Sequence, residues 1–379
     1  MGTRSLVLVL FLLLPLVAAP ASAQRQNVMI IDITTPEGQL LRQVKEESDD
    51  AKKVALMDQF LAQYPKHEGV VWVYSQMVAS CAKLGQFDKA MAAAEKVLAE
   101  DPADLGTAVA AVKAAEAKKD ADAVRKWAVQ VSDVARKAAQ APKAEGEDDD
   151  AFKQRVDYAK RLDGYTEYAL LSTALEAPEA AKKIDLLKTL VERAPESAYI
   201  SQAYGLYFSA LVQSGDVPAA VAMAEQRIAK GQGNELMLAT VGDFYLHQNR
   251  EPQKVLDYSS KLLELVNTKP KPDGVSDADW QKNKDYFLGW GQWMTGVVYC
   301  TQGKLAEANK VLRAALPLLE GNDERMAGAL YNLGMANSQL RNVADASKFF
   351  EQCIAIKSPY QPVCTDKLKA IRSTYRVIK

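Results

Sequence analysis

Apolar and small residues recur every three or four positions along most of the chain, which is the spacing of one face of an α-helix. Residues 327–360 show this pattern most clearly, because two such stretches flank the short polar segment 340–343. The pattern predicts two helices joined by a tight turn, with the second helix ending before Pro359. The inward-facing positions are Leu330, Leu333, Gly334 and Asn337 on the first helix and Ala346, Phe350, Cys353 and Ile354 on the second.

Similar helix pairs are predicted through the rest of the chain. In residues 71–104, Gly85 stands in the turn and Pro102 follows the second helix. One pair of helices cannot bury its own apolar face, so neighbouring pairs have to stack on one another. Further pairs are predicted to begin near residues 36, 105, 151, 201, 235 and 276, and a last helix is predicted over 363–377.

The 34-residue unit, with the small residues Gly334 and Ala346 and the large Phe350, resembles a tetratricopeptide repeat (TPR). The resemblance implies an all-α fold, a right-handed α-solenoid of TPR-like helix–turn–helix repeats with a C-terminal capping helix. It also implies that the first helices of successive repeats line a concave groove. In such folds the groove binds a peptide or a partner protein.

The breaker-rich segment 269–275, with two prolines and a glycine, interrupts the repeats. The predicted organisation is a signal peptide over 1–23, a flexible tail over 24–35, an N-terminal TPR-like array over 36–268, a loop insertion over 269–275, and C-terminal TPR repeats with a capping helix over 276–379.

The first 23 residues have the three parts of a secretory signal peptide. Arg4 gives the positive start, an apolar run follows, and Ala21-Ser22-Ala23 is a small-residue cleavage site before Gln24. An uncleaved membrane anchor is the alternative, but the run contains Pro15 and is short of the ~18–20 residues that span a bilayer. No later stretch is apolar enough to span a membrane. We therefore expect an exported protein, periplasmic or secreted, from a bacterium.

Charge and composition narrow the class of partner. The chain is 48% hydrophobic and 25% charged, which is ordinary for a globular protein. Without Arg4 it has 46 basic and 48 acidic residues, a net charge of −2. This balance argues against nucleic acid as a partner, because nucleic-acid binding needs a clustered excess of Lys and Arg.

The four cysteines are too few for a scaffold built on disulfides. Cys81 and Cys300 have the spacing of small buried residues. Cys353 and Cys364 lie on consecutive predicted helices, on either side of a turn. A disulfide between them and a pair of free thiols both remain open, because a bond requires the two Cα atoms to come within ~7 Å.

No arrangement of catalytic or metal-binding residues stands out in the sequence. The two histidines, His67 and His247, have no partner at metal-ligand spacing, and Gly303-Lys304 lacks the following Ser or Thr of a phosphate-binding loop. We therefore predict that the protein is not an enzyme and has no cofactor, metal site or catalytic residues.

The groove-facing positions are the candidates for partner binding. Asp243 and His247 are predicted to face this groove, and Trp290 and Trp293 form the most ligand-like pair. Aromatic residues contribute strongly to binding at interfaces and also stack on sugars. Burial in the core is an alternative for both tryptophans, and a glycan-binding helical protein is the alternative function. The predicted partner-binding residues are Trp72, Trp290, Trp293, Tyr331 and Gln339.

Overall fold

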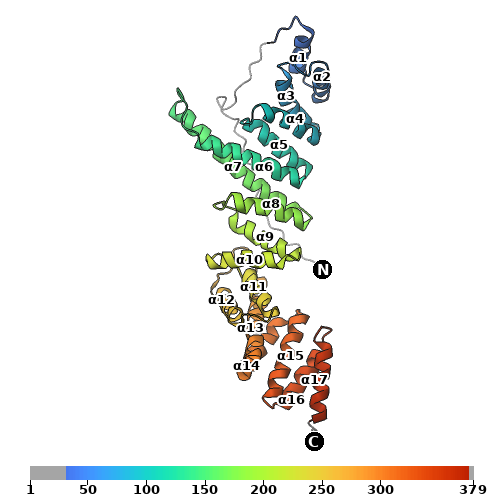
Figure 1. The fold of residues 1–379 in the computed structure, drawn as a ribbon, viewed down its shortest axis with the longest axis vertical. Helices are drawn as coiled ribbons and strands as arrows, with labels where there is room; N and C mark the ends of the chain where they lie inside the picture. The colour runs from blue at the N-terminus through green and yellow to red at the C-terminus, as the bar shows by residue number, and fades with distance from the viewer. Residues whose placement is uncertain (1–30, 375–379) are drawn as a thin grey trace. The chain divides into compact units, whose positions relative to one another are not determined.

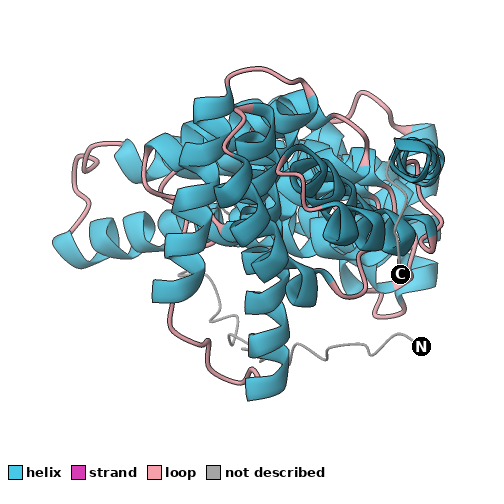
Figure 2. Ribbon diagram, turned by 90° about the horizontal axis from the view of Figure 1, so that it is seen from below, coloured by secondary structure: helices cyan, strands magenta, loops and turns pink. Residues whose placement is uncertain are grey.

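The computed structural model describes residues 31–374, and within this range it contains helices and connecting loops without any strand (Figures 1 and 2). The predicted signal peptide and most of the predicted tail lie outside the described residues. The helices are α1 Pro36–Glu46, α2 Asp50–Gln63, α3 Val70–Lys83, α4 Phe87–Glu100, α5 Leu105–Lys118, α6 Ala121–Gln140, α7 Asp149–Glu176, α8 Ala180–Arg193, α9 Ile200–Gln213, α10 Val217–Ala229, α11 Glu235–His247, α12 Pro252–Thr268, α13 Asp277–Thr301, α14 Leu305–Ala315, the 3₁₀ turn η1 Leu316–Leu319, α15 Asp323–Gln339, α16 Val343–Ile354 and α17 Gln361–Thr374.

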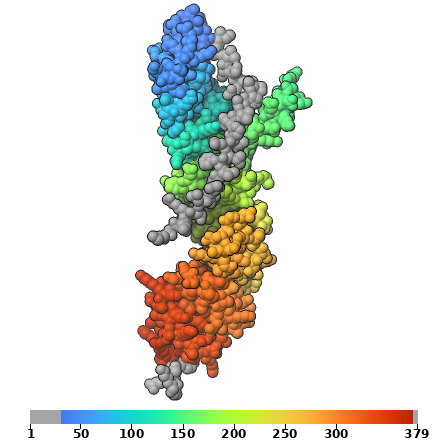
Figure 3. Space-filling model, turned by 180° about the vertical axis from the view of Figure 1, so that it is seen from behind, coloured from blue at the N-terminus to red at the C-terminus, as the bar shows by residue number. Residues whose placement is uncertain are grey.

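The chain divides into two compact units, Met1–Tyr207 and Phe208–Lys379, and the division falls inside α9. In each unit most consecutive helices pack against one another around an apolar core of that unit. The loop 269–275 lies within the second unit. In the first unit the ends of α6 and α7 near residues 140–149 project from the surface (Figure 3). The prediction of an all-helical, TPR-like repeat structure is thus confirmed for residues 31–374.

Short polar side chains begin most of these helices. The side chain of Asp49 accepts a hydrogen bond from the backbone N–H of Lys52, and Ser276 accepts one from that of Asp279. Each cap satisfies a backbone donor that has no partner within the helix. Asp104, Asp120, Asp148, Asp216, Asn234 and Asn322 cap their helices in the same way.

A left-handed residue ends the first helix of most pairs. Glycine adopts this conformation without strain, and it stands there in three pairs, whereas Lys119 and Arg341 carry long side chains at φ 59° and 62°. The turn therefore requires a left-handed backbone conformation, but it does not require that the residue be glycine. The positions are Gly85, Lys119, Gly215, Asn249, Gly303 and Arg341.

One recurring contact fixes how closely the two helices of a pair approach. A Cβ built at Gly334 would lie 2.5 Å from Phe350, and one built at Gly296 would lie 2.4 Å from Leu312. Both glycines lie on the first helix, sixteen residues before the large side chain on the second. At Gly242, sixteen residues before Tyr258, the nearest side chain is instead Met294 of α13, whose sulfur would lie 2.9 Å from an added Cβ. The absence of a side chain on one helix makes room for a large one on the other.

In two other pairs the first helix carries the larger side chain and the second helix the smaller one. Val78 and Ala94 occupy the same two positions in α3 and α4, and Phe208 and Ala224 occupy them in α9 and α10. All four side chains are buried. Each pair therefore combines one small and one larger residue at this spacing, and either helix can carry the larger one.

The last two helices are joined covalently. Cys353 in α16 and Cys364 in α17 form a disulfide, with their Cα atoms 6.3 Å apart. The sequence left this bond open, because the sequence does not give the packing of α17 on α16. Cys81 and Cys300 are free thiols, and burial raises the pKa of Cys300 to about 11.

The size exchange at Gly334 and Phe350 can be tested by a double-mutant cycle. Gly334→Val should destabilise the α15–α16 pair by about 1–3 kcal/mol, because the new side chain meets the Phe350 ring. Phe350→Ala should cost about 3–5 kcal/mol by leaving a cavity. The double variant should be less destabilised than the sum of the two, because the introduced valine occupies part of that cavity. Hydrogen exchange of the α15 and α16 amides measures all three changes, and strict additivity would contradict the interpretation.

Candidate functional site

The first helices α11, α13 and α15 of the second unit pack side by side, α13 contacting both of the others. Their facing side chains form a group that we call the tryptophan–arginine cluster: Asp243, His247, Trp290, Trp293 and Arg325. The helical spacing that buries the apolar residues also places these polar and aromatic residues on one shared face.

Arg325 is the centre of the cluster. Its guanidinium carbon lies 3.5 Å from the centroid of the Trp290 ring and 5.9 Å from that of Trp293. This is the geometry of a cation–π contact, which guanidinium groups favour because they are weakly hydrated. The backbone N–H of Arg325 donates to the capping side chain of Asn322, so the cap holds the backbone from which this side chain extends.

Arg325 also forms an ion pair with Asp243. Its Nη2 lies 3.4 Å from Oδ2 of Asp243, and the two side chains are only 17% and 19% exposed. The contact joins α15 to α11, 82 residues apart in the sequence. Water screens such a pair far less than an exposed one, so removal of either partner would leave a poorly solvated charge.

The Asp243 carboxyl depends on its neighbours to remain ionised. Burial raises its pKa, whereas the charges of His247 and Arg325 act in the opposite direction. His247 Nδ1 lies 3.0 Å from the carboxylate, and most of the imidazole is exposed. Protonation of this imidazole would therefore add a second positive charge beside Asp243.

Three buried donors in the cluster have no acceptor among residues 31–374. They are Nε1 of Trp290, Nε1 of Trp293 and Nε of Arg325. The two tryptophan side chains are 6% and 5% exposed. A buried donor without an acceptor lowers the stability of the fold by about 1–3 kcal/mol. Acceptor oxygens near these three donors would therefore stabilise the cluster. Water or a bound partner can supply such oxygens.

Two tyrosines extend the surface beyond the tryptophans. A Cβ built at Gly328 would lie 3.3 Å from both the Trp293 indole nitrogen and the Tyr360 ring, so a glycine at this position lets the two side chains approach α15 closely. The Tyr360 ring lies 5.5 Å from that of Tyr331, centroid to centroid. Both tyrosines are partly buried.

The structure places the five predicted partner-binding residues in different surroundings. Trp290, Trp293 and Tyr331 share the surface just described. Gln339 is exposed at the C-terminal end of α15, and Trp72 is partly buried against the core of the first unit. Both Trp290 and Trp293 are buried, as core packing predicts, but their indole nitrogens lack the partner that a satisfied core residue has.

The sequence did not reveal Arg325 and Tyr360 as members of this surface. Arg325 follows Asp323 and Glu324 in the first turn of α15, where a charged residue is normally solvated. Its spacing of three from Gly328 is a signal that could have placed it on the same face as that glycine. Tyr360 lies in a turn, outside any helical periodicity.

Among residues 31–374 no group of three or more His, Cys, Asp or Glu side chains is arranged to hold a metal ion. In the same range, none of the helices combines the length and the apolar character needed to cross a bilayer.

Comparison with protein families matches residues 73–104 and 327–360 to the tetratricopeptide repeat. These segments correspond to α3–α4 and α15–α16, so the repeats predicted at both places are confirmed. Tetratricopeptide repeats generally bind proteins or peptides and are typically non-catalytic. No curated protein matches the chain.

Solved structures of low sequence identity are similar to the chain. One is the APC/C hetero-tetramer Cut9-Hcn1, with 14% identity and a TM-score of 0.38, covering 90% of this chain and 57% of that one. Another is NprR in complex with its cognate peptide NprX, with 13% identity and a TM-score of 0.31, covering 91% of this chain and 84% of that one.

The contribution of the Asp243–Arg325 pair can be separated from that of exposed pairs. Arg325→Met and Asp243→Asn should each destabilise α11 and α15 by about 2–3 kcal/mol, because each leaves a partly buried charge unpaired. The double variant should recover most of this loss.

Arg313→Met is the matched control, because Arg313 also lies over an aromatic ring and pairs with Asp345, but in an exposed position. We expect it to cost less than about 1 kcal/mol. The measurement is hydrogen exchange of the α11 and α15 amides for the buried pair and of the α14 and α16 amides for the control pair. Equal losses in the two arginine variants would show that burial of the pair has no effect.

Proposed function

We propose that the chain, two segments of which match the tetratricopeptide repeat, is a non-catalytic scaffold or adaptor that binds a partner protein or peptide. The face formed by α11, α13 and α15 is the proposed contact surface of the second unit. The observation that supports this choice is the tryptophan–arginine cluster, with its three buried donors that have no acceptor among the described residues.

A partner that covers this face acts on the cluster in two ways. Its carbonyl or carboxylate oxygens accept from the partly exposed Arg325 guanidinium and the exposed His247 imidazole, and its bulk excludes water from them. Exclusion of water strengthens these hydrogen bonds, which is why Trp, Tyr and Arg dominate the energetic centres of interfaces. Tyr331 and Tyr360 supply further contact area beside them.

We also propose that the protein acts outside the bacterial cytoplasm, in the periplasm or as a secreted protein. The pattern of residues 1–23 supports export. The Cys353–Cys364 disulfide supports it independently, because such bonds form and persist in oxidising compartments.

The glycan-binding alternative has no observation in its favour. A sugar ring stacks on an exposed aromatic face, but the face of Trp290 is covered by Arg325, and Trp293 is buried. We therefore do not advance it.

Site-specific photocrosslinking tests the proposed contact surface. A benzophenone side chain placed at Met335, one turn after Tyr331 on α15, should crosslink to one specific partner in intact cells, and one placed at Lys310 on α14 should not. The crosslink should be lost in the Asp243→Asn/Arg325→Met double variant, whose fold we expect to be retained. Equal crosslinking at both positions, or a crosslink unaffected by the double variant, would refute the assignment of this face.

Export is tested on the full chain expressed in a bacterial host. The protein recovered from the periplasm or medium should begin at Gln24. After denaturation without reductant it should react with two equivalents of thiol reagent, from Cys81 and Cys300, and with four after reduction. Deletion of residues 1–23 should leave the protein in the cytoplasm. Retention of the full chain in the cytoplasm with an intact Met1 would contradict export.

A further inference from the structure

A hollow of about 630 Å³ opens in the first unit, well separated in sequence from the tryptophan–arginine cluster. Its walls come from three places: the turn between α5 and α6 (residues 116–122), the C-terminal part of α7 (168–176), and the turn into α8 (177–182). The hollow is thus formed by the turns and helix ends of two successive helix pairs.

The lining of the hollow carries more negative than positive charge. Five carboxyl groups and three ammonium groups line it, a formal balance of −2, whereas the chain as a whole has a net charge of −1. The carboxyl groups belong to Glu116, Asp120, Asp122, Glu176 and Glu179, and the ammonium groups to Lys118, Lys119 and Lys182.

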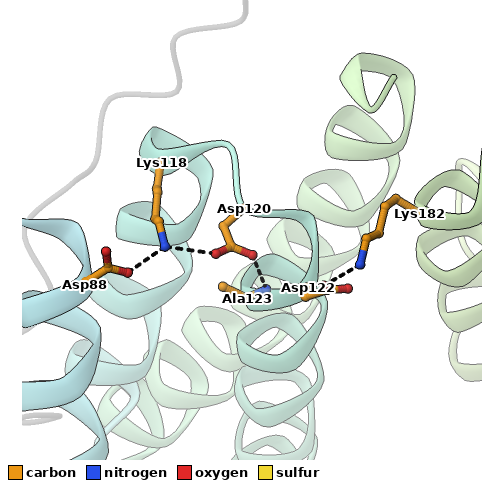
Figure 4. Close-up of polar contacts among 6 residues, drawn as sticks. All are labelled: Asp88, Lys118, Asp120, Asp122, Ala123 and Lys182. Carbon is orange, nitrogen blue, oxygen red and sulfur yellow. Dashed lines mark hydrogen bonds and ion pairs between the residues drawn. The ribbon is translucent and has the colours of Figure 1, made fainter. Parts of the chain in front are cut away.

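Two of the three lysines are already held by aspartates. Lys118 Nζ lies 2.6 Å from Asp88 Oδ1 and 3.1 Å from Asp120 Oδ2, and Lys182 pairs with Asp122 (Figure 4). Asp120 also accepts from the backbone N–H of Ala123, which fixes its carboxylate at the start of α6. Because these lysines and aspartates are already paired within the protein, the other polar groups of the hollow are the ones available to a ligand.

Lys119 forms a weak ion pair across the hollow. Its Nζ lies 3.6 Å from Glu176 Oε2, and the two side chains are 80% and 70% exposed, so the pair contributes little to stability. Lys119 also has the left-handed backbone conformation for which other pairs use glycine. Because the Lys119 side chain forms only this exposed ion pair, a competing cation easily displaces it from Glu176.

The remaining groups suit a guanidinium. Glu179 forms no ion pair within residues 31–374, and Tyr168, 40% exposed, presents an aromatic ring in the same lining. Carboxylates beside an accessible aromatic ring bind arginine through paired hydrogen bonds and a cation–π contact. Glu116 is not available in this way, because the hydroxyl of Tyr165 donates to it and burial raises its pKa.

We propose that this hollow binds an arginine-containing basic segment of a partner protein. The arginine displaces Lys119 from Glu176, pairs with Glu176 and Glu179, and lies against Tyr168. This second docking surface goes beyond the proposed function of the α11–α13–α15 face, and each can fail without the other.

Fluorescence anisotropy of a labelled peptide tests the proposal with the mature full chain. The probe is fluorescein-Gly-Arg-Gly-Arg-Gly-amide, with the citrulline and lysine peptides as comparisons. The citrulline peptide, which has the same shape without the charge, should bind at least tenfold more weakly. The lysine peptide should bind more weakly than the arginine peptide, because it lacks the planar fork and the stacking surface.

Variants locate the binding. Glu176→Gln/Glu179→Gln should weaken binding at least tenfold, and Tyr168→Ala several-fold. Glu192→Gln/Glu196→Gln removes the same charge from exposed positions at the end of α8 and after it, and should have little effect. Lys119→Gly should tighten binding about threefold by removing the competing cation, whereas Lys52→Gln, which removes a distant lysine, should not.

Circular dichroism of each variant verifies that it is folded. Equal weakening by the two glutamate double variants, equal effects of the two lysine variants, or equal affinity for the arginine and citrulline peptides would each overturn the proposal. Binding should persist in the Asp243→Asn/Arg325→Met variant, which separates this surface from the one in the second unit.

Discussion

Close approach of the two helices within each pair is the constraint on which the rest of the structure depends. Where Gly334 or Gly296 removes a side chain from the first helix, Phe350 or Leu312 fills the space from the second. Where the first helix carries Val78 or Phe208, the second carries an alanine. The depth of this contact sets the distance between the helix axes. That distance in turn decides which residues of neighbouring first helices can meet.

Exposed and buried ion pairs have different effects on this common frame. In the first unit, exposed pairs such as Lys89–Asp58 and Lys126–Glu95 join each second helix to the next, and salt screens them readily. In the second unit, the Asp243–Arg325 pair is mostly buried and is covered by tryptophan rings. Ionic strength should therefore act mainly on the exposed pairs, which in the second unit include Arg313–Asp345, and removal of a partner mainly on the buried pair.

The sequence predicted much of this fold, because helix periodicity, capping residues and turn glycines are local signals. The start of α13 near residue 276 and the pairs α3–α4 and α15–α16 follow from such signals. The site was predictable only in part. Asp243, His247, Trp290 and Trp293 were placed by spacing, whereas Arg325 belongs to the cluster through a contact spanning 82 residues. The Cys353–Cys364 bond likewise depends on how α17 packs, which no local pattern encodes.

The disulfide has a consequence for how the second unit comes apart. Stacked helix pairs hold only their neighbours, so such arrays tend to fray from a free end, one helix at a time. The bond between α16 and α17 removes that first step at the carboxyl end, because α17 cannot leave without α16. Since α16 is anchored by Phe350 in the space above Gly334, detachment there becomes a concerted event involving three helices. A pulling force or an unfoldase that engages this end would therefore meet its strongest resistance at the outset.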